Sequence, residues 1–166
     1  MKIAVLKERR PFETRVAATP ETVKKLIGMG YGVAVESGAG SESAYADQAY
    51  RDAGAQIRDA ATALSDADIV LKVQRPLTAA EGADEIAMLK SGAILIALFN
   101  PYGAKAELPL YAVRNITALA MELVPRITRA QGMDVLSSQA NLAGYKAVLD
   151  AVSEFGRAVP MMMTAA

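Results

Sequence analysis

The chain has 166 residues, 52% of them hydrophobic, which is enough for one domain with a buried core and too few for two domains of ordinary size. Lys plus Arg and Asp plus Glu number 18 each, so no excess charge points to nucleic acid or another polyelectrolyte as a partner. The absence of Cys and His excludes disulfides, removes the usual zinc ligands and takes away the commonest general acid–base group, so no metal site is expected.

The first residues contain neither a secretion signal nor a membrane span. The apolar part of MKIAVLKERR is too short for a signal peptide and charges follow it at once. No run in the sequence approaches the roughly 20 apolar residues that cross a bilayer, so we expect a soluble chain.

Short apolar runs alternate with helix signals from the start of the chain. Residues 2–6 are typical of a buried strand. The charged residues 7–15 then form a loop at its carboxyl end, which is where ligands bind in open α/β sheets. Thr19 suits a helix N-cap and Pro20 the first helical position, so we expect a helix that ends at Gly30.

A glycine-rich turn at residues 37–40 separates a predicted strand at 32–36 from a predicted helix at 45–53. This order suggests a dinucleotide-binding turn, but the third glycine of that motif would fall at position 43, which is Ser43. We therefore favour an ordinary tight connection between strand and helix over a phosphate site.

The remaining alternation predicts the fold class. Further strands are expected at residues 55–58, 69–73, 93–98 and 116–121, and further helices at residues 60–65, 81–90 and 107–114. Such spacing favours a doubly wound α/β fold, with a mostly parallel sheet covered by helices on both faces, Rossmann-like or flavodoxin-like and without its own dinucleotide fingerprint.

Polar side chains gather densely at residues 125–145, where we expect a loop before Asp134 and a helix after it. Asp134 is placed to cap a helix that begins at Val135, because its carboxylate can accept the free N–H groups of the first turn. Two cations, a carboxamide, a carboxylate and two hydroxyls meet near this helix start: Arg126, Arg129, Gln131, Asp134, Ser137 and Ser138. Such a group suits an anionic or amide-bearing ligand, and the alternative is capping in a solvated loop.

The predicted helix from Val135 to about Phe155 carries one apolar stripe with several small residues. It could bridge two subdomains or pack on its own sheet. Residues 159–166, VPMMMTAA, are apolar to the end, which suggests an interrupted chain.

Two stretches, RITRAQGMDVLSSQANLAGYKAV and KERRPFETRVAATPETVKKL, closely resemble the NAD(H)-binding component of proton-translocating nicotinamide nucleotide transhydrogenase, in its N-terminal subdomain. Alanine dehydrogenase shares the N-terminal pattern, whereas RITRAQGMDVLSSQ is specific to transhydrogenases. The resemblance covers essentially the whole chain. It implies a subdomain at residues 1–134, a connecting helix at 135–157, and at 158–166 the start of a link to a second, NAD-binding subdomain.

The resemblance also implies the activity and its location. The family passes a hydride from NADH to NADP+ held by a partner domain, while a membrane component translocates protons. The chain would then be cytoplasmic, held peripherally at the inner membrane through its partner subunits, and a homodimer without nucleic acid.

The family's site residues match positions that are intact here. Arg126, Gln131 and Asp134 are expected in catalysis, and together with Ser137 they are expected to bind the nicotinamide of NAD(H), with Arg129 and Tyr145 as lesser candidates. Hydride transfer between nicotinamides requires positioning rather than an acid–base pair, so the lack of His is compatible with it.

Two alternatives stay open. Alanine dehydrogenases use an arginine and a lysine, matched by Arg15 and Lys72, and a histidine that this chain lacks. Here we expect Arg15 and Lys72 to hold the fold, paired with carboxylates such as Glu8 or Glu122. The other alternative is a non-catalytic interface module that forms one wall of a cleft and binds no cofactor by itself.

Overall fold

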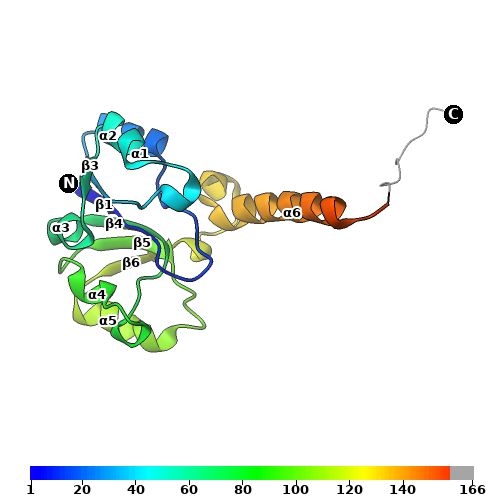
Figure 1. Cartoon of the computed structure of the whole chain (residues 1–166). Helices are drawn as coiled ribbons and strands as arrows, with labels where there is room; N and C mark the ends of the chain where they lie inside the picture. Colours follow the sequence, from blue (N-terminus) through cyan, green and yellow to red (C-terminus); the bar gives the residue numbers. More distant parts are fainter. Residues whose placement is uncertain (158–166) are drawn as a thin grey trace. The chain divides into compact units, whose positions relative to one another are not determined.

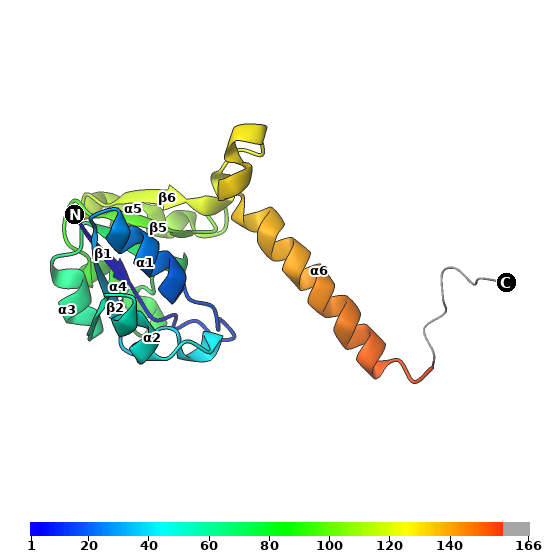
Figure 2. The ribbon, with the colours of Figure 1, turned by 90° about the horizontal axis from the view of Figure 1, so that it is seen from above.

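The computed structural model describes residues 1–157, which fall into two compact units, Met1–Leu123 and a second that begins at Val124. The first unit is built on one sheet of six strands in the order β3-β2-β1-β4-β5-β6. The strands are β1 (Lys2–Val5), β2 (Gly32–Glu36), β3 (Gln56–Arg58), β4 (Ile69–Gln74), β5 (Ile94–Leu98) and β6 (Thr117–Ala120). All neighbouring strands of this sheet pair in parallel, and β6 lies along one edge (Figures 1 and 2).

Helices cover both faces of this sheet, which confirms the predicted doubly wound α/β class. The helices of the first unit are α1 (Pro20–Gly28), α2 (Asp47–Asp52), α3 (Ala60–Ser65), α4 (Glu85–Met88) and α5 (Leu108–Val113). The strand order reverses between β1 and β4, as in the Rossmann arrangement, and this decides against the flavodoxin-like order. The carboxyl ends of β1 and β4 therefore mark the crevice where such sheets bind ligands.

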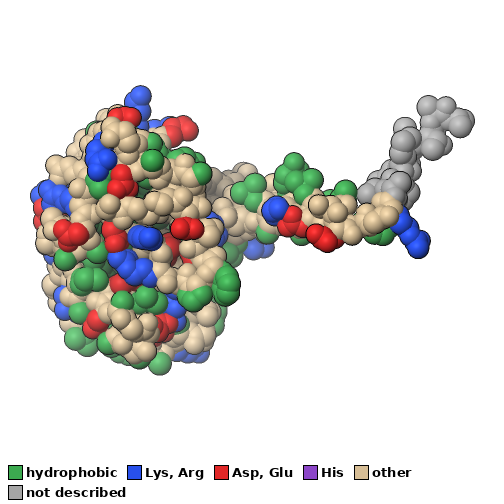
Figure 3. All heavy atoms as spheres, viewed as in Figure 1, with side chains coloured by type: hydrophobic (Ala, Val, Ile, Leu, Met, Phe, Trp, Pro, Cys, Tyr) green, Lys and Arg blue, Asp and Glu red, His purple; other side chains and the backbone are tan. Residues whose placement is uncertain are grey.

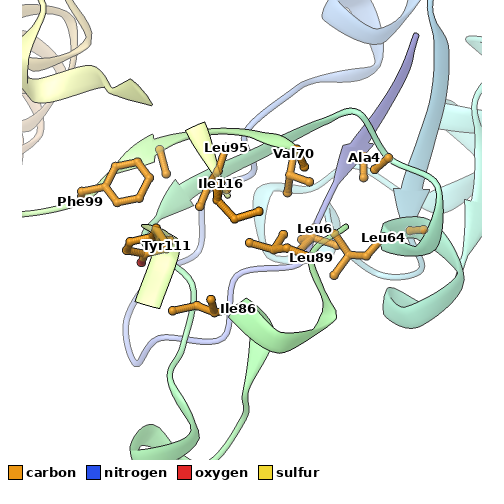
Figure 4. Packing of buried hydrophobic residues seen from close by; sticks show 14 residues of the cluster. Ala4, Leu6, Leu64, Val70, Ile86, Leu89, Leu95, Phe99, Tyr111 and Ile116 are labelled. Carbon is orange, nitrogen blue, oxygen red and sulfur yellow. The ribbon is translucent and has the colours of Figure 1, made fainter. Parts of the chain in front are cut away.

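Two separate cores result from this winding. Val23 of α1 and Tyr50 of α2 pack with the β1–β2 side chains of one face, while Leu64, Ile86 and Tyr111 of α3, α4 and α5 pack on the other. Figure 4 shows the second core, with Phe99 beside Tyr111 in an edge-to-face contact of 5.4 Å between ring centroids. Parallel strands that are buried on both sides need continuous apolar runs, and these runs allowed the strands to be predicted from the sequence.

The start of α1 follows the predicted local chemistry. The Thr19 hydroxyl accepts the N–H of Thr22, and Pro20 occupies the first turn where no N–H is needed. Gly30, just beyond the helix, has a φ of 91°, a conformation that glycine adopts without strain.

The single helix predicted at residues 81–90 is wrong. A short 3-10 helix, Ala79–Glu81, ends at Gly82, whose φ of 92° breaks the helical path. Asp84 then caps a separate helix by accepting the N–H of Ala87 at 3.0 Å. The helices predicted at residues 45–53 and 107–114 are present as α2 and α5, which are shorter by one or two residues at each end, and a 3-10 turn precedes each of them, Ser41–Ser43 and Lys105–Glu107.

The glycine-rich turn after β2 is an ordinary connection, as favoured from its sequence. The N–H of Gly38 donates to the Asp47 carboxylate at 2.8 Å, and the Ser37 hydroxyl donates to the other oxygen at 2.7 Å. A side chain at Gly40 would come within 2.8 Å of Tyr45 and Tyr50, so this glycine permits close packing. The turn's hydrogen-bonding capacity is thus used within the fold.

The second unit contains a 3-10 helix, Thr128–Met133, and the long helix α6 (Val135–Glu154). The stretch around Arg129 and Gln131, expected as a loop, is therefore partly helical. The predicted start of α6 at Val135 is confirmed, and its end lies one residue before Phe155. The predicted domain limits, including the bridging role of this helix, stay predictions, and the proposed link at 158–166 lies outside the described residues.

Among residues 1–157, no helix combines the length and apolar character needed to cross a membrane.

The packing of the larger core gives a stability prediction. Leu95 is fully buried in β5, so Leu95→Ala should lower the free energy of unfolding by about 2–5 kcal/mol, measured by urea denaturation. Val113 is 82% exposed at the end of α5, and Val113→Ala should change the free energy of unfolding by less than about 0.5 kcal/mol. Equal effects of the two substitutions would contradict this assignment of the core.

Candidate functional site

The candidate site in the second unit is organised by Asp134 at the start of α6. One carboxylate oxygen of Asp134 accepts the backbone N–H of Ser137 at 2.9 Å, and the other accepts the Ser137 hydroxyl at 2.6 Å. These bonds hold the pKa of Asp134 below its ordinary value, and the positive charge of Arg126 adds a smaller effect in the same direction. Asp134 is therefore a carboxylate whose orientation is set by the first turn of the helix.

This capping pair decides what the two serine hydroxyls can do. The Ser137 hydroxyl directs its only proton to Asp134, so it can offer a ligand its lone pairs but no proton. Ser138 donates instead to the backbone carbonyl of Asp134 at 3.0 Å. Of the two hydroxyls singled out from the sequence, only that of Ser137 is held by the Asp134 carboxylate.

The remaining candidates leave their polar groups available. Arg126, Arg129 and Gln131 are exposed, and within residues 1–157 their side chains make no hydrogen bond or ion pair. Gln131 is tied to the cap through its backbone, whose carbonyl accepts the N–H of Asp134 at 3.3 Å. Tyr145 is 66% exposed on α6. The geometry thus brings Asp134 and Ser137 into contact, places the Arg126 charge near them, and does not join Arg129 or Tyr145 to the group.

A second group of charges, in the first unit, lies at the carboxyl ends of β1 and β4. The Lys72 ammonium is 3.1 Å from Glu85 and 3.7 Å from Glu8, and all three side chains are at most 2% exposed. Arg9, whose side chain is 29% exposed, extends this cluster to the surface by pairing with Glu85 at 2.9 Å and with Glu36. Burial raises the pKa of Glu8, and the nearby Lys72 charge opposes that effect. We call these five residues the buried ion cluster.

The observed ion pairs can be compared with the expectation that Lys72 and Arg15 pair with carboxylates such as Glu8 or Glu122. Lys72 does pair with Glu8, and Glu85 is a second partner that the sequence did not reveal. Arg15 pairs with Glu13 at 2.6 Å, and this bond lowers the pKa of Glu13 to about 2. Glu122 instead accepts the backbone N–H of Phe99 at 2.7 Å, so its predicted pairing with a cation was wrong.

Glu85 was missed for a definite reason. It lies 13 residues from Lys72 and within the helix predicted at residues 81–90, and glutamate side chains in proteins are mostly solvated. The available sequence signal was the neighbouring Asp84, which caps a helix that begins at Glu85, and Glu85 is buried in that helix. The Glu13–Arg15 pair had a simpler signal, because residues two apart in an extended segment share a side.

Surface features elsewhere in the first unit do not add to either group. The pocket lined by Lys2, Tyr31, Gly54 and Arg58 lies at the amino ends of β1, β2 and β3, opposite the predicted ligand crevice. On the face of this unit seen in Figure 3, acidic and basic side chains are interspersed rather than segregated. Within residues 1–157, no three acidic side chains are grouped to hold a metal ion.

Comparison with known proteins places these residues in a family context. The family model described as "Alanine dehydrogenase/PNT, N-terminal domain" matches residues 4–143. The chain is 58% identical to the first part of NAD(P) transhydrogenase subunit alpha of Rhodospirillum rubrum over 167 residues, which is 100% of this chain and 44% of that protein. It is 34% identical to alanine dehydrogenase of Bacillus subtilis, over 89% of this chain and 37% of that protein.

A solved structure gives the same relationship. The transhydrogenase from Sinorhizobium meliloti superposes with a TM-score of 0.90 at 51% identity, covering 99% of this chain and 48% of that one. The chain thus spans less than half the length of the relatives that it matches.

The buried ion cluster predicts a large effect of removing its central cation. Lys72→Met should lower the free energy of unfolding by about 3–5 kcal/mol, because Glu8 and Glu85 would stay buried without their partner. The control is Lys90→Met, since Lys90 pairs with Asp68 at the surface, and it should change stability by less than about 1 kcal/mol. Chemical denaturation of both variants measures the difference, and a small effect of Lys72→Met would mean that the cluster is not stabilising.

Proposed function

Because this chain belongs to the family of alanine dehydrogenase/PNT N-terminal domains, we propose that it forms one wall of the NAD(H) site of a transhydrogenase, which passes a hydride from NADH to NADP+ on a partner domain. The observation that carries the proposal is the Asp134–Ser137 pair, near the Arg126 charge and joined through the backbone to Gln131. These groups provide a donor, acceptors and a positive charge at one helix start, which fits the carboxamide of a nicotinamide and the negative charge of the cofactor's phosphates.

Each residue has a distinct role in the proposed site. Gln131 can both donate to and accept from the carboxamide of the nicotinamide. Ser137 accepts from the carboxamide N–H group because its own proton is committed to Asp134. Asp134 acts mainly by holding Ser137 in place, and Arg126 supplies positive charge for the ring or the phosphates. NADH, when bound, supplies the hydride, and the chain supplies orientation and exclusion of water.

Two observations support a transhydrogenase over an alanine dehydrogenase. The identity to the Rhodospirillum rubrum transhydrogenase subunit, 58%, is well above the 34% identity to the Bacillus subtilis alanine dehydrogenase. The chain also contains no histidine for the proton transfers that oxidative deamination requires. In the proposed enzyme Arg15 and Lys72 hold the fold, consistent with their pairing to Glu13, Glu8 and Glu85.

The proposal assigns the other steps to other regions of the enzyme. A second subdomain would hold the pyrophosphate of NAD(H), a partner domain would bind NADP(H), and a membrane component would translocate protons. This chain would then work on the cytoplasmic side of the inner membrane through its partners, as one subunit of a homodimer. The longer relatives, of which the chain covers 44% and 48%, leave room for such a second subdomain.

A second candidate function is an interface module that binds no cofactor alone. It is favoured by two connections of the first unit, the glycine-rich turn after β2 and the loop after β1, because both use their polar groups within the fold. The glycine-rich turn donates to Asp47, and the loop after β1 is filled by ion pairs of Arg9, Arg10 and Arg15.

Binding of NADH separates these candidates. We expect the 166-residue chain to bind NADH at least about 100-fold more weakly than a longer polypeptide that continues into the second subdomain, because half a cleft buries little of the ligand. Isothermal calorimetry on both proteins measures this ratio. Failure of both proteins to bind NADH would contradict the proposed site, and equally tight binding would contradict the need for a second wall.

The role of Gln131 gives the test of mechanism. In the complete enzyme, Gln131→Ala should slow hydride transfer by about 10- to 100-fold and weaken NADH binding much less, because a misplaced ring loses reactivity before it loses affinity. Single-turnover kinetics with NADH and NADP+ gives the rate, and fluorescence titration gives the affinity. Gln48→Ala, on the surface of α2, is the matched control and should leave both unchanged. An unaltered rate in the Gln131 variant would remove this residue from the mechanism.

A further inference from the structure

Asp134 is held at each of its hydrogen-bonding groups. Its backbone N–H donates to the carbonyl of Gln131 at 3.3 Å, and its two carboxylate oxygens accept the N–H and the hydroxyl of Ser137. Its backbone carbonyl accepts the N–H of Ser138 at 3.3 Å and also the Ser138 hydroxyl at 3.0 Å. The hydroxyl bond comes from a residue to which the proposed site gives no role.

The same kind of cap occurs in the first unit without a second serine. At the start of α3, Asp59 accepts the N–H of Thr62 at 2.9 Å and its hydroxyl at 2.6 Å, the same distances as at Asp134. The next residue is Ala63, which offers the Asp59 carbonyl its backbone N–H at 2.9 Å but no hydroxyl. A hydroxyl at the position of Ser138 is therefore not required to start a helix in this chain.

The backbone of Asp134 differs from that of the other caps. Thr19 and Asp59, which cap α1 and α3, have the extended conformation usual for this position, with ψ angles of 163° and 164°. Asp134 has a ψ of 84°, and it is both the C-cap of the 3-10 helix Thr128–Met133 and the N-cap of α6. Because no other residue separates the two helices, the dihedral angles of Asp134 fix the direction in which α6 leaves the 3-10 helix.

This joint separates the two groups that the proposed function directs to one carboxamide. Gln131 belongs to the 3-10 helix, whereas Ser137 belongs to the first turn of α6. A rotation about the ψ bond of Asp134 would move one relative to the other. The carboxylate of Asp134 lies before this bond and its carbonyl lies after it, and Ser137 and Ser138 bind them from the same turn. The bond from the Ser138 hydroxyl therefore opposes the rotation.

We propose that Ser138 is a positioning residue for hydride transfer, which fixes the joint at Asp134 and so keeps Gln131 aligned with Ser137. The inference rests on the proposed function, because it requires those two side chains to hold one carboxamide. Serine hydroxyls often donate to a carbonyl one turn earlier in a helix, but here that carbonyl belongs to the joint between two segments of the site. Reactive groups must be held to within about 0.5 Å, so a small rotation at the joint should reduce the rate.

The test is single-turnover hydride transfer from NADH to NADP+ in the complete enzyme carrying Ser138→Ala. Alanine favours a helix, so the fold should be retained. We expect the rate to fall by about 3- to 10-fold and the Kd for NADH to change by less than about twofold, because the binding groups are present but less well aligned. Ser138→Thr should restore the rate, since a threonine hydroxyl in a helix can bind the same carbonyl.

Ser65→Ala is the matched control. The Ser65 hydroxyl also donates to a helix carbonyl, that of Thr62 at 3.0 Å, but it lies at the end of α3 on the surface of the first unit. Its removal should leave the rate and the NADH affinity unchanged. Thermal unfolding of all variants verifies that the folded state is retained.

A second measurement follows the joint itself in the 166-residue chain without cofactor. The bonds from Ser137 hold the pKa of Asp134 below its ordinary value, so a looser joint should raise that pKa toward the ordinary value. NMR of the Asp134 carboxyl carbon during a pH titration measures the pKa in the wild type and in both Ser138 variants. We expect it to rise in Ser138→Ala and to stay unchanged in Ser138→Thr.

The contrary outcomes are distinct. If Gln131→Ala slows hydride transfer and Ser138→Ala does not, the positioning role is overturned while the proposed function stands. A large loss of NADH affinity in Ser138→Ala would also overturn it, because the hydroxyl would then contact the cofactor. An unchanged pKa of Asp134 in this variant would overturn it as well, since the joint would not depend on Ser138. If neither Gln131→Ala nor Ser138→Ala slows the reaction, both proposals fail together.

Discussion

The buried Lys72 ammonium is the interaction on which the carboxyl edge of the sheet depends. It reaches Glu8 in the segment after β1 and Glu85 at the start of α4, and Glu85 in turn binds Arg9, which pairs with Glu36 at the end of β2. The carboxylates also accept backbone N–H groups, from Val73 to Glu8 at 2.6 Å and from Leu77 to Glu85 at 2.7 Å. Buried charges are tolerated only when they are paired and hydrogen-bonded in this way.

This cluster also shapes what the edge can offer to other molecules. Because its cations and carboxylates satisfy one another, the loop after β1 is held rigidly against β4 and retains little free charge. The polar groups of the second unit have the opposite character, since Arg126 and Gln131 have no side-chain partners among residues 1–157. The first unit therefore uses these charges to stabilise its fold, whereas Arg126 and Gln131 of the second unit keep their polar groups available.

Sequence patterns were informative where a structure is decided by neighbours along the chain. The Thr19–Pro20 helix start, the Asp134 cap and the apolar strands all rest on local hydrogen bonds or on continuous apolar runs, and they appear as predicted. The prediction of one helix at residues 81–90 was wrong because it followed the helical pattern of the whole segment. The local signals of Gly82, which ends a 3-10 helix, and of Asp84, which caps a new helix, decide the structure there. The 3-10 helix before Asp134 was expected as a loop, since short 3-10 turns lack a distinctive sequence period.

By itself the sequence determined the α/β class, the polar group at residues 126–137 and the cap that orders it, because each depends on contacts within a few residues. Only the tertiary structure decided the strand order and the partnership of Lys72 with Glu85. Strand order depends on which apolar runs pair across long loops, and a buried ion pair depends on where two distant carboxylates and a cation converge in a space without water. A composition with equal numbers of acidic and basic residues is compatible with many such pairings, and folding selects one of them.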